Sequence, residues 1–409
     1  MRIAVFTDLY LEVTGGIPSS VRAQKQALTA AGHKVVVFCP KSKQTKLEEV
    51  GVVAVPTMSW KLAGAPMPKR PKVIKKFVIE KFPRFGEDFD LVHVHYEGSC
   101  SIAGVELARK YGLPVVQTMH GREDIAVAYN VPLLFKTMVA GILEKLHGRK
   151  LKHEVQVKPD NYLATTKARA RMWTLMVGQA NAADVVITPS AHFAEKIKHY
   201  GVRTRIEVVS NGVPDEVIEM YDWPVRRLET NEDLRLIWSS RLSQEKRIMP
   251  FLEAIKELRA EKIKVTLIGD GNQLGRAKRY VARHGLKRKV RFLGAVSHRR
   301  VLKELIDQDV MVMNSYGFDT QGLTMLEAEA CGLPVIYADP DMRKILPDKG
   351  GVWTGGPEVW RMVDTIKKLM DKPELVTEMS QEMLNRRKEV LQSTQLLKLL
   401  AVYEGVIKN

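Results

Sequence analysis

The sequence predicts an α/β protein made of two domains, each organised around a parallel sheet. The chain has 409 residues, which is more than one hydrophobic core ordinarily organises. Apolar runs of strand length alternate with segments of helical spacing in both halves, and this alternation indicates repeated βαβ units. The pattern predicts domains over residues 1–214 and 232–390, a charged linker with Trp and Pro over 215–231, and a final amphipathic helix within 391–409.

The composition limits the classes of partner. Hydrophobic residues make up 45% of the chain and charged residues 27%, as in a soluble globular protein. The net charge of +17 predicts a polyanionic partner, which can be a nucleic acid, an acidic membrane surface or an acidic substrate. No apolar run of about 18 residues occurs, so no transmembrane helix is expected. The first residues lack signal-peptide features, and Cys39, Cys100 and Cys331 show no metal-ligand spacing, so a reducing cytoplasm is expected.

The chain opens with a predicted strand over residues 2–6 and a loop over 9–20. This loop carries the pair Gly15-Gly16, and a helix and a strand over 34–38 follow it. The glycine pair fits a loop beside a phosphate or an acceptor, but it does not have the GxGxxG spacing of a dinucleotide site. On spacing alone, a plain turn is nearly as good an interpretation.

Two buried-strand patterns, 90–95 and 114–120, end in histidines. Sites in open α/β sheets lie beyond the carboxyl ends of strands, so His120 is a candidate site residue. His93 and His95 alternate onto one face of their strand and are interpreted as structural. No third ligand has a suitable spacing, so no metal site is predicted.

Two segments of the first half combine basic and apolar residues. Residues 61–84 hold eight Lys or Arg and a single acid, and part of this segment can form a basic amphipathic helix. Residues 131–147 place Leu134, Met138, Ile142 and Leu146 on one helical stripe, with basic residues accumulating after it. Each segment can contact an anionic bilayer, where a basic residue contributes about 1 kcal/mol. The alternatives are a solvated basic face for the first and a core-facing stripe for the second.

The second half begins a new βα series. A strand over 234–240 leads directly to Arg241 and Lys246, two cations that suit a departing diphosphate in a water-poor cleft. The next strand, 264–268, ends in a turn with Gly269 and Gly271. A third strand, 290–294, leads to Val296.

Residues 319–334 read as a loop, a short helix and the start of a strand. Gly322 lets the backbone approach a ligand closely where the helix begins, and the first amides of that helix suit a phosphate. Asp319 and Glu327 bracket this predicted anion site. Because carboxylates repel phosphate, they are expected to face sugar hydroxyls, and the stretch therefore indicates a nucleotide-sugar.

This stretch resembles the E-x7-E signature of retaining glycosyltransferases with the GT-B fold, and its Thr-Gln-Gly-Leu variant is similar to members that glycosylate membrane lipids. These include diacylglycerol glucosyltransferases and phosphatidylinositol mannosyltransferases. Asp319 is a departure, since the family usually has Glu. The resemblance implies two Rossmann-like domains facing across a cleft, with the last helix crossing back to the N-terminal domain.

The resemblance also implies a role for each candidate residue. Arg241 and Lys246 would neutralise the diphosphate, helped by the amides of Gly322, Leu323 and Thr324. Glu327 would bind ribose, Asp319 the hexose hydroxyls, and His120 the transferring sugar near its anomeric centre. The remaining candidates, Gly15, Gly16, Gly269, Gly271 and Val296, would line the nucleotide or its phosphates. No cofactor is expected beyond the nucleotide-sugar, which is expected to be UDP-linked.

The expected acceptor is a membrane lipid such as diacylglycerol or a glycolipid, handled by a peripheral protein on the inner face of the cell membrane. A soluble acceptor, a catalytically dead scaffold and a basic nucleic-acid-binding protein are the alternatives. The nucleic-acid alternative lacks a recognition module and a base-stacking aromatic series, so no nucleic acid is expected.

Overall fold

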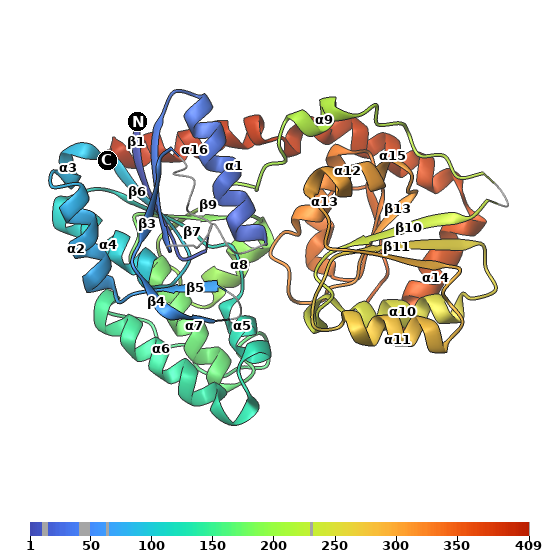
Figure 1. Ribbon diagram of the computed structural model, residues 1–409, viewed down its shortest axis with the longest axis horizontal. Helices are drawn as coiled ribbons and strands as arrows, with labels where there is room; N and C mark the ends of the chain where they lie inside the picture. The colour runs from blue at the N-terminus through green and yellow to red at the C-terminus, as the bar shows by residue number, and fades with distance from the viewer. Residues whose placement is uncertain (10–14, 41–49, 63–64, 230–231, 409) are drawn as a thin grey trace. The chain divides into compact units, whose positions relative to one another are not determined.

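The computed structural model describes residues 1–9, 15–40, 50–62, 65–229 and 232–408. The chain divides into two compact units (Figure 1). Unit 1 comprises Met1–Asn211 together with Gln395–Asn409, and unit 2 comprises Gly212–Thr394. No helix in the described ranges combines the length and the apolar character needed to cross a bilayer.

Unit 1 is built on a parallel sheet with the strand order β3-β2-β1-β6-β7-β8-β9. A small antiparallel pair, β4 with β5, lies outside this sheet. The strands are β1 (Arg2–Thr7), β2 (Lys34–Pro40), β3 (Val52–Val55), β4 (Thr57–Leu62), β5 (Ala65–Pro68), β6 (Leu91–His95), β7 (Val115–Thr118), β8 (Val185–Thr188) and β9 (Arg205–Val208). The helices are α1 (Gly16–Ala30), α2 (Pro71–Lys81), α3 (Phe85–Asp88), α4 (Ser99–Tyr111), α5 (Glu123–Asn130), η1 (Leu133–Phe135), α6 (Lys136–Leu151), α7 (Lys167–Ala180), α8 (Ala191–His199) and α16 (Gln392–Ile407).

Unit 2 repeats this architecture with a parallel sheet of strand order β12-β11-β10-β13-β14-β15. The strands are β10 (Leu234–Ser239), β11 (Ile263–Ile268), β12 (Val290–Gly294), β13 (Val310–Met313), β14 (Val335–Tyr337) and β15 (Gly351–Trp353). The helices are α9 (Glu216–Met220), η2 (Gln244–Lys246), α10 (Ile248–Glu257), α11 (Leu274–Arg283), α12 (His298–Ile306), α13 (Leu323–Ala330), η3 (Pro340–Lys344), α14 (Val359–Asp371), α15 (Glu374–Arg386) and η4 (Arg387–Val390). The predicted α/β class with two Rossmann-like domains is confirmed.

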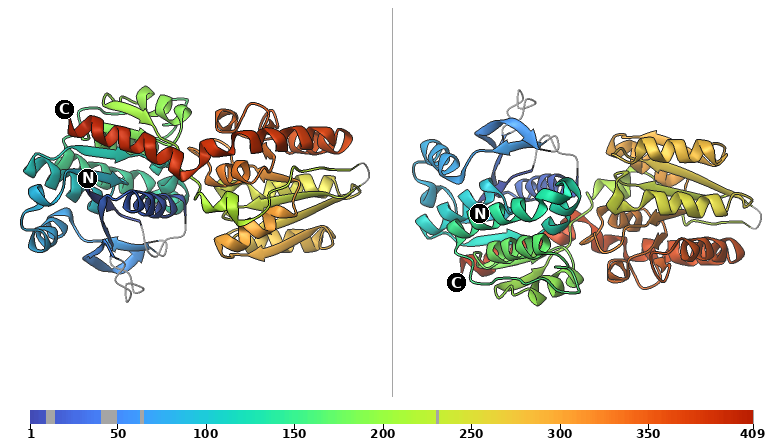
Figure 2. Two further views of the ribbon diagram at one scale, coloured as in Figure 1. Left: turned by 90° about the horizontal axis from the view of Figure 1, so that it is seen from above. Right: turned by 90° about the horizontal axis from the view of Figure 1, so that it is seen from below.

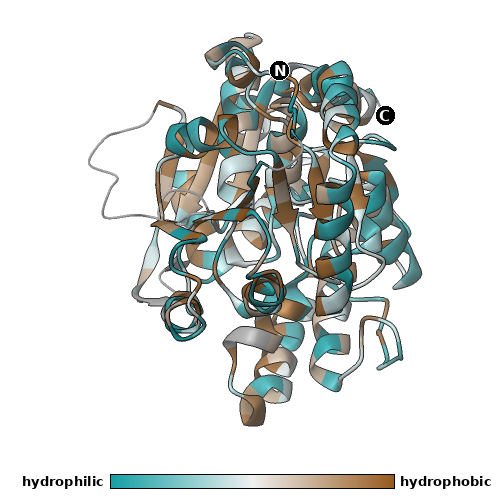
Figure 3. Cartoon of the chain, turned by 90° about the vertical axis from the view of Figure 1, so that its right-hand side faces the viewer, coloured by the Kyte–Doolittle hydropathy of each residue, from teal (hydrophilic) through white to brown (hydrophobic). Residues whose placement is uncertain are grey.

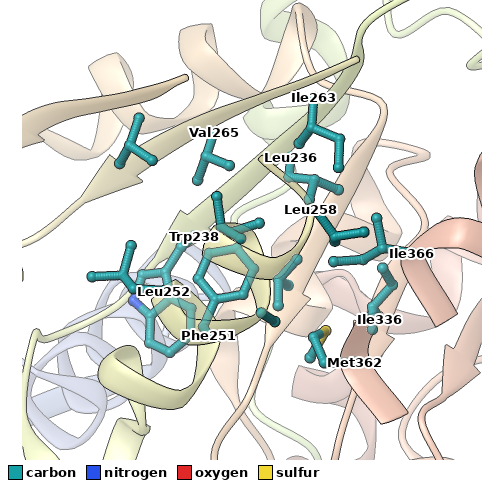
Figure 4. Packing of buried hydrophobic residues seen from close by; sticks show 14 of the residues in the cluster. Leu236, Trp238, Phe251, Leu252, Leu258, Ile263, Val265, Ile336, Met362 and Ile366 are labelled. Carbon is teal, nitrogen blue, oxygen red and sulfur yellow. The ribbon is translucent and has the colours of Figure 1, made fainter. Parts of the chain in front are cut away.

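Both faces of each sheet are covered by helices, as the views from above and below show (Figure 2). In unit 1, Ala4 and Phe6 pack with α2 and α4 on one face, while Ile3 and Val5 pack with α1 and α16 on the other. This is the period of two that strands impose on side chains. In unit 2, Trp238 and Phe251 stack with ring centroids 5.4 Å apart inside the core that Figure 4 shows.

The last helix belongs to unit 1, as predicted. Leu399, Val402 and Tyr403 of α16 are buried in the same cluster as β1, β2 and β7. The predicted linker over 215–231 instead belongs to unit 2, because Trp223 and Arg226 within it are buried there. Arg226 donates from Nη2 to the carbonyl oxygens of Leu305 and Cys331, which ties this segment to the unit 2 core.

The two basic-apolar segments have different environments. In α2 the apolar residues Ile74 and Val78 are buried against α4, while Val73 is 42% exposed beside the basic residues of the outer face. The apolar stripe of η1 and α6 faces away from the core: Leu134, Met138, Ile142 and Leu146 are all exposed. Hydrophobic and hydrophilic residues alternate along the outer helices of the chain (Figure 3). The apolar stripe of α6 therefore does not face the core, while the exposed basic face of α2 fits both interpretations of that segment.

Candidate active site

The loops that carry the unit 2 candidates meet where the strand order of the sheet reverses. Strand β10 lies between β11, which leads outward to one edge, and β13, which leads to the other. Residues Arg241–Lys246 follow β10, and Asp319–Gly322 lie in the loop between β13 and α13. Such a switch point leaves a crevice at the carboxyl ends of the strands, where ligands of open α/β sheets bind.

The structure brings Lys246 and Asp319 into direct contact. Lys246 Nζ lies 2.6 Å from Asp319 Oδ1, and the two side chains are only 15% and 10% exposed. Ser315 Oγ donates to the second carboxylate oxygen of Asp319, and the Lys246 ammonium lies 4.9 Å from the centre of the Phe318 ring. The pair therefore places a partly shielded cation and an acid side by side.

Arg241 is held by an acidic neighbour on the same loop. Its guanidinium lies 3.2 Å from Glu245 Oε1, which also accepts a 2.6 Å hydrogen bond from Ser243 Oγ. The Arg241 side chain is 63% exposed, so it can reach a ligand without losing buried contacts. The structure thus places both predicted cations on the β10 loop.

The start of α13 offers backbone amides to an anion. Gly322 has a φ of 78°, a left-handed conformation that favours glycine. A Cβ at this position would lie 2.6 Å from the terminal methyl of Met313. No side chain caps this end of the helix, so the amides of Leu323 and Thr324 keep the partial positive charge of an uncapped first turn.

Glu327 lies one turn into α13 and has a partner that the sequence did not suggest. Its Oε1 lies 2.9 Å from His298 Nε2, at the start of α12. The hydrogen bond to Glu327 raises the pKa of His298 above its ordinary value. Val296, two residues earlier, is half-buried against the unit 2 core.

The two glycines after β11 permit a close backbone approach. Gly269 has a φ of 129°, and a Cβ there would lie 2.0 Å from the carbonyl oxygen of Ser240. Gly271 has a φ of 155°, and its Cβ would lie 2.5 Å from the carbonyl oxygen of Leu242. Glycine at both positions lets the β11 loop pack directly against the loop that carries Arg241 and Lys246.

Unit 1 has a switch point of its own, between β1 and β6, but an acid closes it. Asp8 follows β1 and accepts hydrogen bonds from the amides of Cys100 (2.8 Å) and Ser101 (3.2 Å) at the start of α4. A Cβ at Gly98 would lie 2.5 Å from the Asp8 carboxyl carbon. The α4 amides are therefore already occupied by a carboxylate, whereas the first turn of α13 in unit 2 has no side-chain cap. Gly15 and Gly16 lie at the start of α1, and Gly15 leaves open space around its position.

His120 lies after β7 at the end of a row of histidines. Its Nε2 lies 2.8 Å from His95 Nδ1, and the His95 ring lies 3.9 Å from that of His93. Burial lowers the pKa of His120 to about 4, so the imidazole is neutral at pH 7. A neutral ring suits contact with a sugar hydroxyl better than contact with a diphosphate. His93 bonds Thr118 and Tyr403, which agrees with its structural interpretation.

Acidic groups that the sequence analysis passed over lie beside these histidines. Tyr96 Oη donates to Glu123 Oε2 over 2.8 Å, and burial raises the pKa of Glu123 to about 7. Glu97 is also buried, and its pKa is raised by that burial and by the charge of Glu123. Within the described ranges, no group of three or more His, Cys, Asp or Glu side chains has the geometry of a metal site.

The family models assign the two units. The model described as Glycosyltransferase Family 4 matches residues 14–217, and the model described as Glycosyl transferases group 1 matches residues 219–386. Together they span nearly the whole chain.

The chain is a GT-B glycosyltransferase.

Relatives of this glycosyltransferase act on different acceptors. It is 24% identical over 376 residues to the alpha-monoglucosyldiacylglycerol synthase of Streptococcus pneumoniae, a match that covers 85% of this chain and 74% of the relative. It is 26% identical over 404 residues to the glycogen synthase of Mycobacterium tuberculosis, covering 91% and 87% of the two chains. The family is therefore shown, while the acceptor is not decided by similarity.

Solved structures share the fold. Sucrose-phosphate synthase from Thermosynechococcus elongatus superposes with a TM-score of 0.72 at 16% identity and covers 100% of both chains. Anabaena HepE in complex with UDP superposes with a TM-score of 0.70 at 15% identity, covering 99% of this chain and 100% of that one. The predicted GT-B fold of the glycosyltransferase is confirmed.

Proposed function

We propose that this glycosyltransferase transfers a hexose, with retention of anomeric configuration, from a UDP-linked donor to a hydroxyl of a membrane lipid such as diacylglycerol or a glycolipid. The donor would lie in the unit 2 crevice. The acceptor would lie on unit 1, whose α6 surface would rest on the anionic face of a bilayer.

The donor assignment rests on charge. As the glycosidic bond breaks, its electron pair moves to the diphosphate oxygen, and negative charge grows where Lys246 and Arg241 can stabilise it. The amides of Leu323 and Thr324 add partial positive charge. Asp319 would accept from hexose hydroxyls, Glu327 from the ribose, and Val296 would lie beside the base. That HepE was solved with UDP supports a uridine nucleotide.

The proposed chemistry needs no protein nucleophile. The acceptor oxygen would bond to the anomeric carbon on the face that the diphosphate leaves, and its proton would pass to the departing phosphate oxygen. His120, neutral at pH 7, would contact the transferring sugar, the role that the family resemblance implies. Gly15, Gly16, Gly269 and Gly271 would leave room for backbone to approach the ligands.

The observation that carries the lipid acceptor is the exposed face of η1 and α6. Leu133 and Leu134 are 81% and 89% exposed. The same face continues along α6, where Met138, Ile142 and Leu146 are each more than 50% exposed. Apolar side chains of this size gathered on one surface helix are uncommon in a protein surrounded only by water. Basic residues lie along the same helix: Lys145, Arg149 and Lys150 are exposed. Apolar and basic side chains together are the features of an interfacial helix.

Vesicle flotation tests this proposal. The full chain is expected to float with vesicles that contain phosphatidylglycerol, and the double variant Leu134→Asp, Met138→Asp is expected to stay in solution. Leu397→Asp is the matched control, because Leu397 is 70% exposed on α16, far along the sequence from α6. Product analysis with UDP-hexose donors and extracted lipid then identifies the acceptor. A chain that ignores vesicles and glycosylates a soluble sugar would replace the lipid acceptor with a soluble one.

A further inference from the structure

A cavity lies between α6 and α7, outside the candidate active site. Its volume is about 420 Å³, and it is lined by Gly141, Glu144, Lys145, Gly148, His153, Gln156 and Arg171. Figure 1 shows α6 alongside α7 in unit 1, and the two helices are in contact. None of these residues has a role in the donor site.

Two glycines allow cationic and imidazole side chains to fold into this space. A Cβ at Gly141 would lie 2.2 Å from Arg171 Nη1. A Cβ at Gly178 would lie 2.1 Å from His153 Cδ2, inside normal contact distance. Any larger residue at these two positions would displace the guanidinium and the ring that line the cavity.

Positive charge exceeds negative charge around the cavity. Arg171 donates from Nη1 to the Thr137 carbonyl (2.7 Å), and its Nε lies 3.6 Å from Glu144 Oε2, so several guanidinium hydrogens are left over. Lys145 makes no ion pair or hydrogen bond with any other residue the structure describes. Glu144 is the one acid in the lining, and burial raises its pKa.

A buried hydrogen-bond chain fixes which nitrogen of His153 carries hydrogen. Gln117 donates from Nε2 to the Thr118 carbonyl, so its Oε1 accepts from Gln179 Nε2 over 2.9 Å. Gln179 Oε1 then accepts from His147 Nε2 (2.9 Å), which leaves His147 Nδ1 to accept from His153 Nε2 (2.6 Å). Burial lowers the pKa of His153, so the ring is neutral at pH 7 and its Nδ1 is an acceptor.

We propose that this cavity is a phosphate-binding site, with Lys145, Arg171 and His153 as the groups that hold the phosphate oxygens. The guanidinium and the ammonium supply charged N–H donors, which suit a phosphate anion, while the neutral imidazole can accept a hydrogen bond from a phosphate O–H. The phosphate can belong to a small soluble ester or to a lipid headgroup, since Ile142 and Leu146 on the same helix are exposed. A soluble phosphate at this site is independent of the proposed function, whereas a lipid phosphate rests on the membrane contact proposed for α6.

Isothermal titration of the full chain with inorganic phosphate and with glycerol 3-phosphate tests the soluble source. Flotation with vesicles that contain phosphatidylglycerol or only phosphatidylcholine tests the lipid source. Lys145→Ala and Arg171→Gln are each expected to weaken binding about tenfold or more, since each removes a charge-assisted hydrogen bond. Lys264→Ala is the control, because Lys264 is exposed in unit 2, lies outside both the cavity lining and the α6 surface, and pairs with Asp233.

The variant Lys246→Ala distinguishes phosphate binding in unit 2 from phosphate binding in the cavity. It is expected to keep the titration signal that comes from the cavity. Loss of the soluble-ester signal in the cavity variants assigns a soluble phosphate. Loss of the vesicle response, with no soluble-ester signal, assigns a lipid phosphate. Equal binding by wild type, Lys145→Ala and Arg171→Gln, with unchanged melting temperatures, overturns the proposal, as does the absence of both responses in the wild type.

Discussion

The ammonium of Lys246, on the loop after β10, lies 2.6 Å from the carboxylate of Asp319, on the loop after β13. This contact joins the loops of two neighbouring strands at the point where the strand order of the unit 2 sheet reverses. If the proposed diphosphate binds there, it meets a lysine already held in place, so little side-chain entropy is lost when the lysine changes partner.

Replacing Lys246 by Ala is expected to lower kcat/KM by about 10²- to 10³-fold, because one fixed charge opposite a growing anion has about this effect. Affinity for free UDP is expected to fall as well, because the lysine would contact the diphosphate both in bound UDP and in the transition state. Steady-state kinetics and UDP titration measure the two effects. Lys264→Ala is the control, since this lysine is 54% exposed and pairs with Asp233. Full turnover by Lys246→Ala would remove the electrostatic part of the proposed mechanism.

Replacing Asp319 by Asn is expected to affect binding of the sugar and binding of the nucleotide differently. If the carboxylate accepts from hexose hydroxyls, this variant loses affinity for the nucleotide-sugar and turnover, while its affinity for UDP stays equal or rises as Lys246 is released. Parallel titrations with UDP and UDP-hexose measure the split. Equal losses for both ligands would instead assign Asp319 to the diphosphate side of the site.

Replacing Gly269 by Ala is expected to destabilise unit 2 by more than about 2 kcal/mol, because the new Cβ meets backbone, and φ is unfavourable for an L-residue. The contact would be 2.0 Å from the Ser240 carbonyl oxygen at a φ of 129°. Gly285→Ala is the matched control, since Gly285 has a φ of 70° but open space around it. That change is expected to cost only about 1 kcal/mol. Urea unfolding of both variants measures the difference, and equal losses would mean that crowding at Ser240 is relieved by local movement.

Much of the unit 2 site could be predicted because the sequence indicates where the strands end. The run 264–268 alternates and stops at a Gly-Asp-Gly turn, and the structure ends β11 at Ile268. Once the ends of β10, β11 and β13 are known, parallel pairing forces the loops after them onto one edge. This is why Lys246 and Asp319, 73 residues apart, could be expected at one site.

The contacts within that site were not predictable, because they depend on loop geometry. His298 reaches Glu327 across 29 residues, and nothing in the spacing indicates the pair. Glu245 holds Arg241 at a separation of four residues, which would have been recognisable only if the loop had been predicted as a helical turn. The α6 stripe shows the limit of periodicity, which predicts an apolar face but does not identify what covers it.

The pair His298–Glu327 is expected to stabilise unit 2 only at acidic to neutral pH. Its hydrogen bond raises the folded pKa of His298, so the stabilisation is fully present below the ordinary pKa of about 6.5 and disappears as pH rises through the folded value. Because His298 is 51% exposed, screening limits the effect to about 0.2–1 kcal/mol. Melting curves of wild type and His298→Gln at pH 5.5 and 8.5 measure it. A Glu327→Gln variant is expected to lose the same pH dependence, and a constant gap across pH would contradict the assignment.

Unit 1 is expected to lose stability as pH falls below about 6.5, because its buried histidines resist protonation. Burial lowers the pKa of both His93 and His147 to about 3. Between about pH 6.5 and pH 3, therefore, these two histidines take up protons only in the unfolded chain. Each such group is expected to remove about 1.4 kcal/mol per pH unit over this range. Hydrogen exchange of β6 and β7 amides at pH 7, 6 and 5 follows unit 1 alone.

His93→Gln is expected to be less stable than wild type at pH 7 but to lose stability less steeply on acidification, since one resisting group is gone. Tyr403→Phe is the matched control. It removes the hydroxyl 2.6 Å from His93 Nδ1 but keeps the buried imidazole, so its stability is expected to be lower while its pH slope stays that of the wild type. If His93→Gln and wild type lose stability in parallel between pH 7 and pH 5, the acid sensitivity of unit 1 arises elsewhere than at His93.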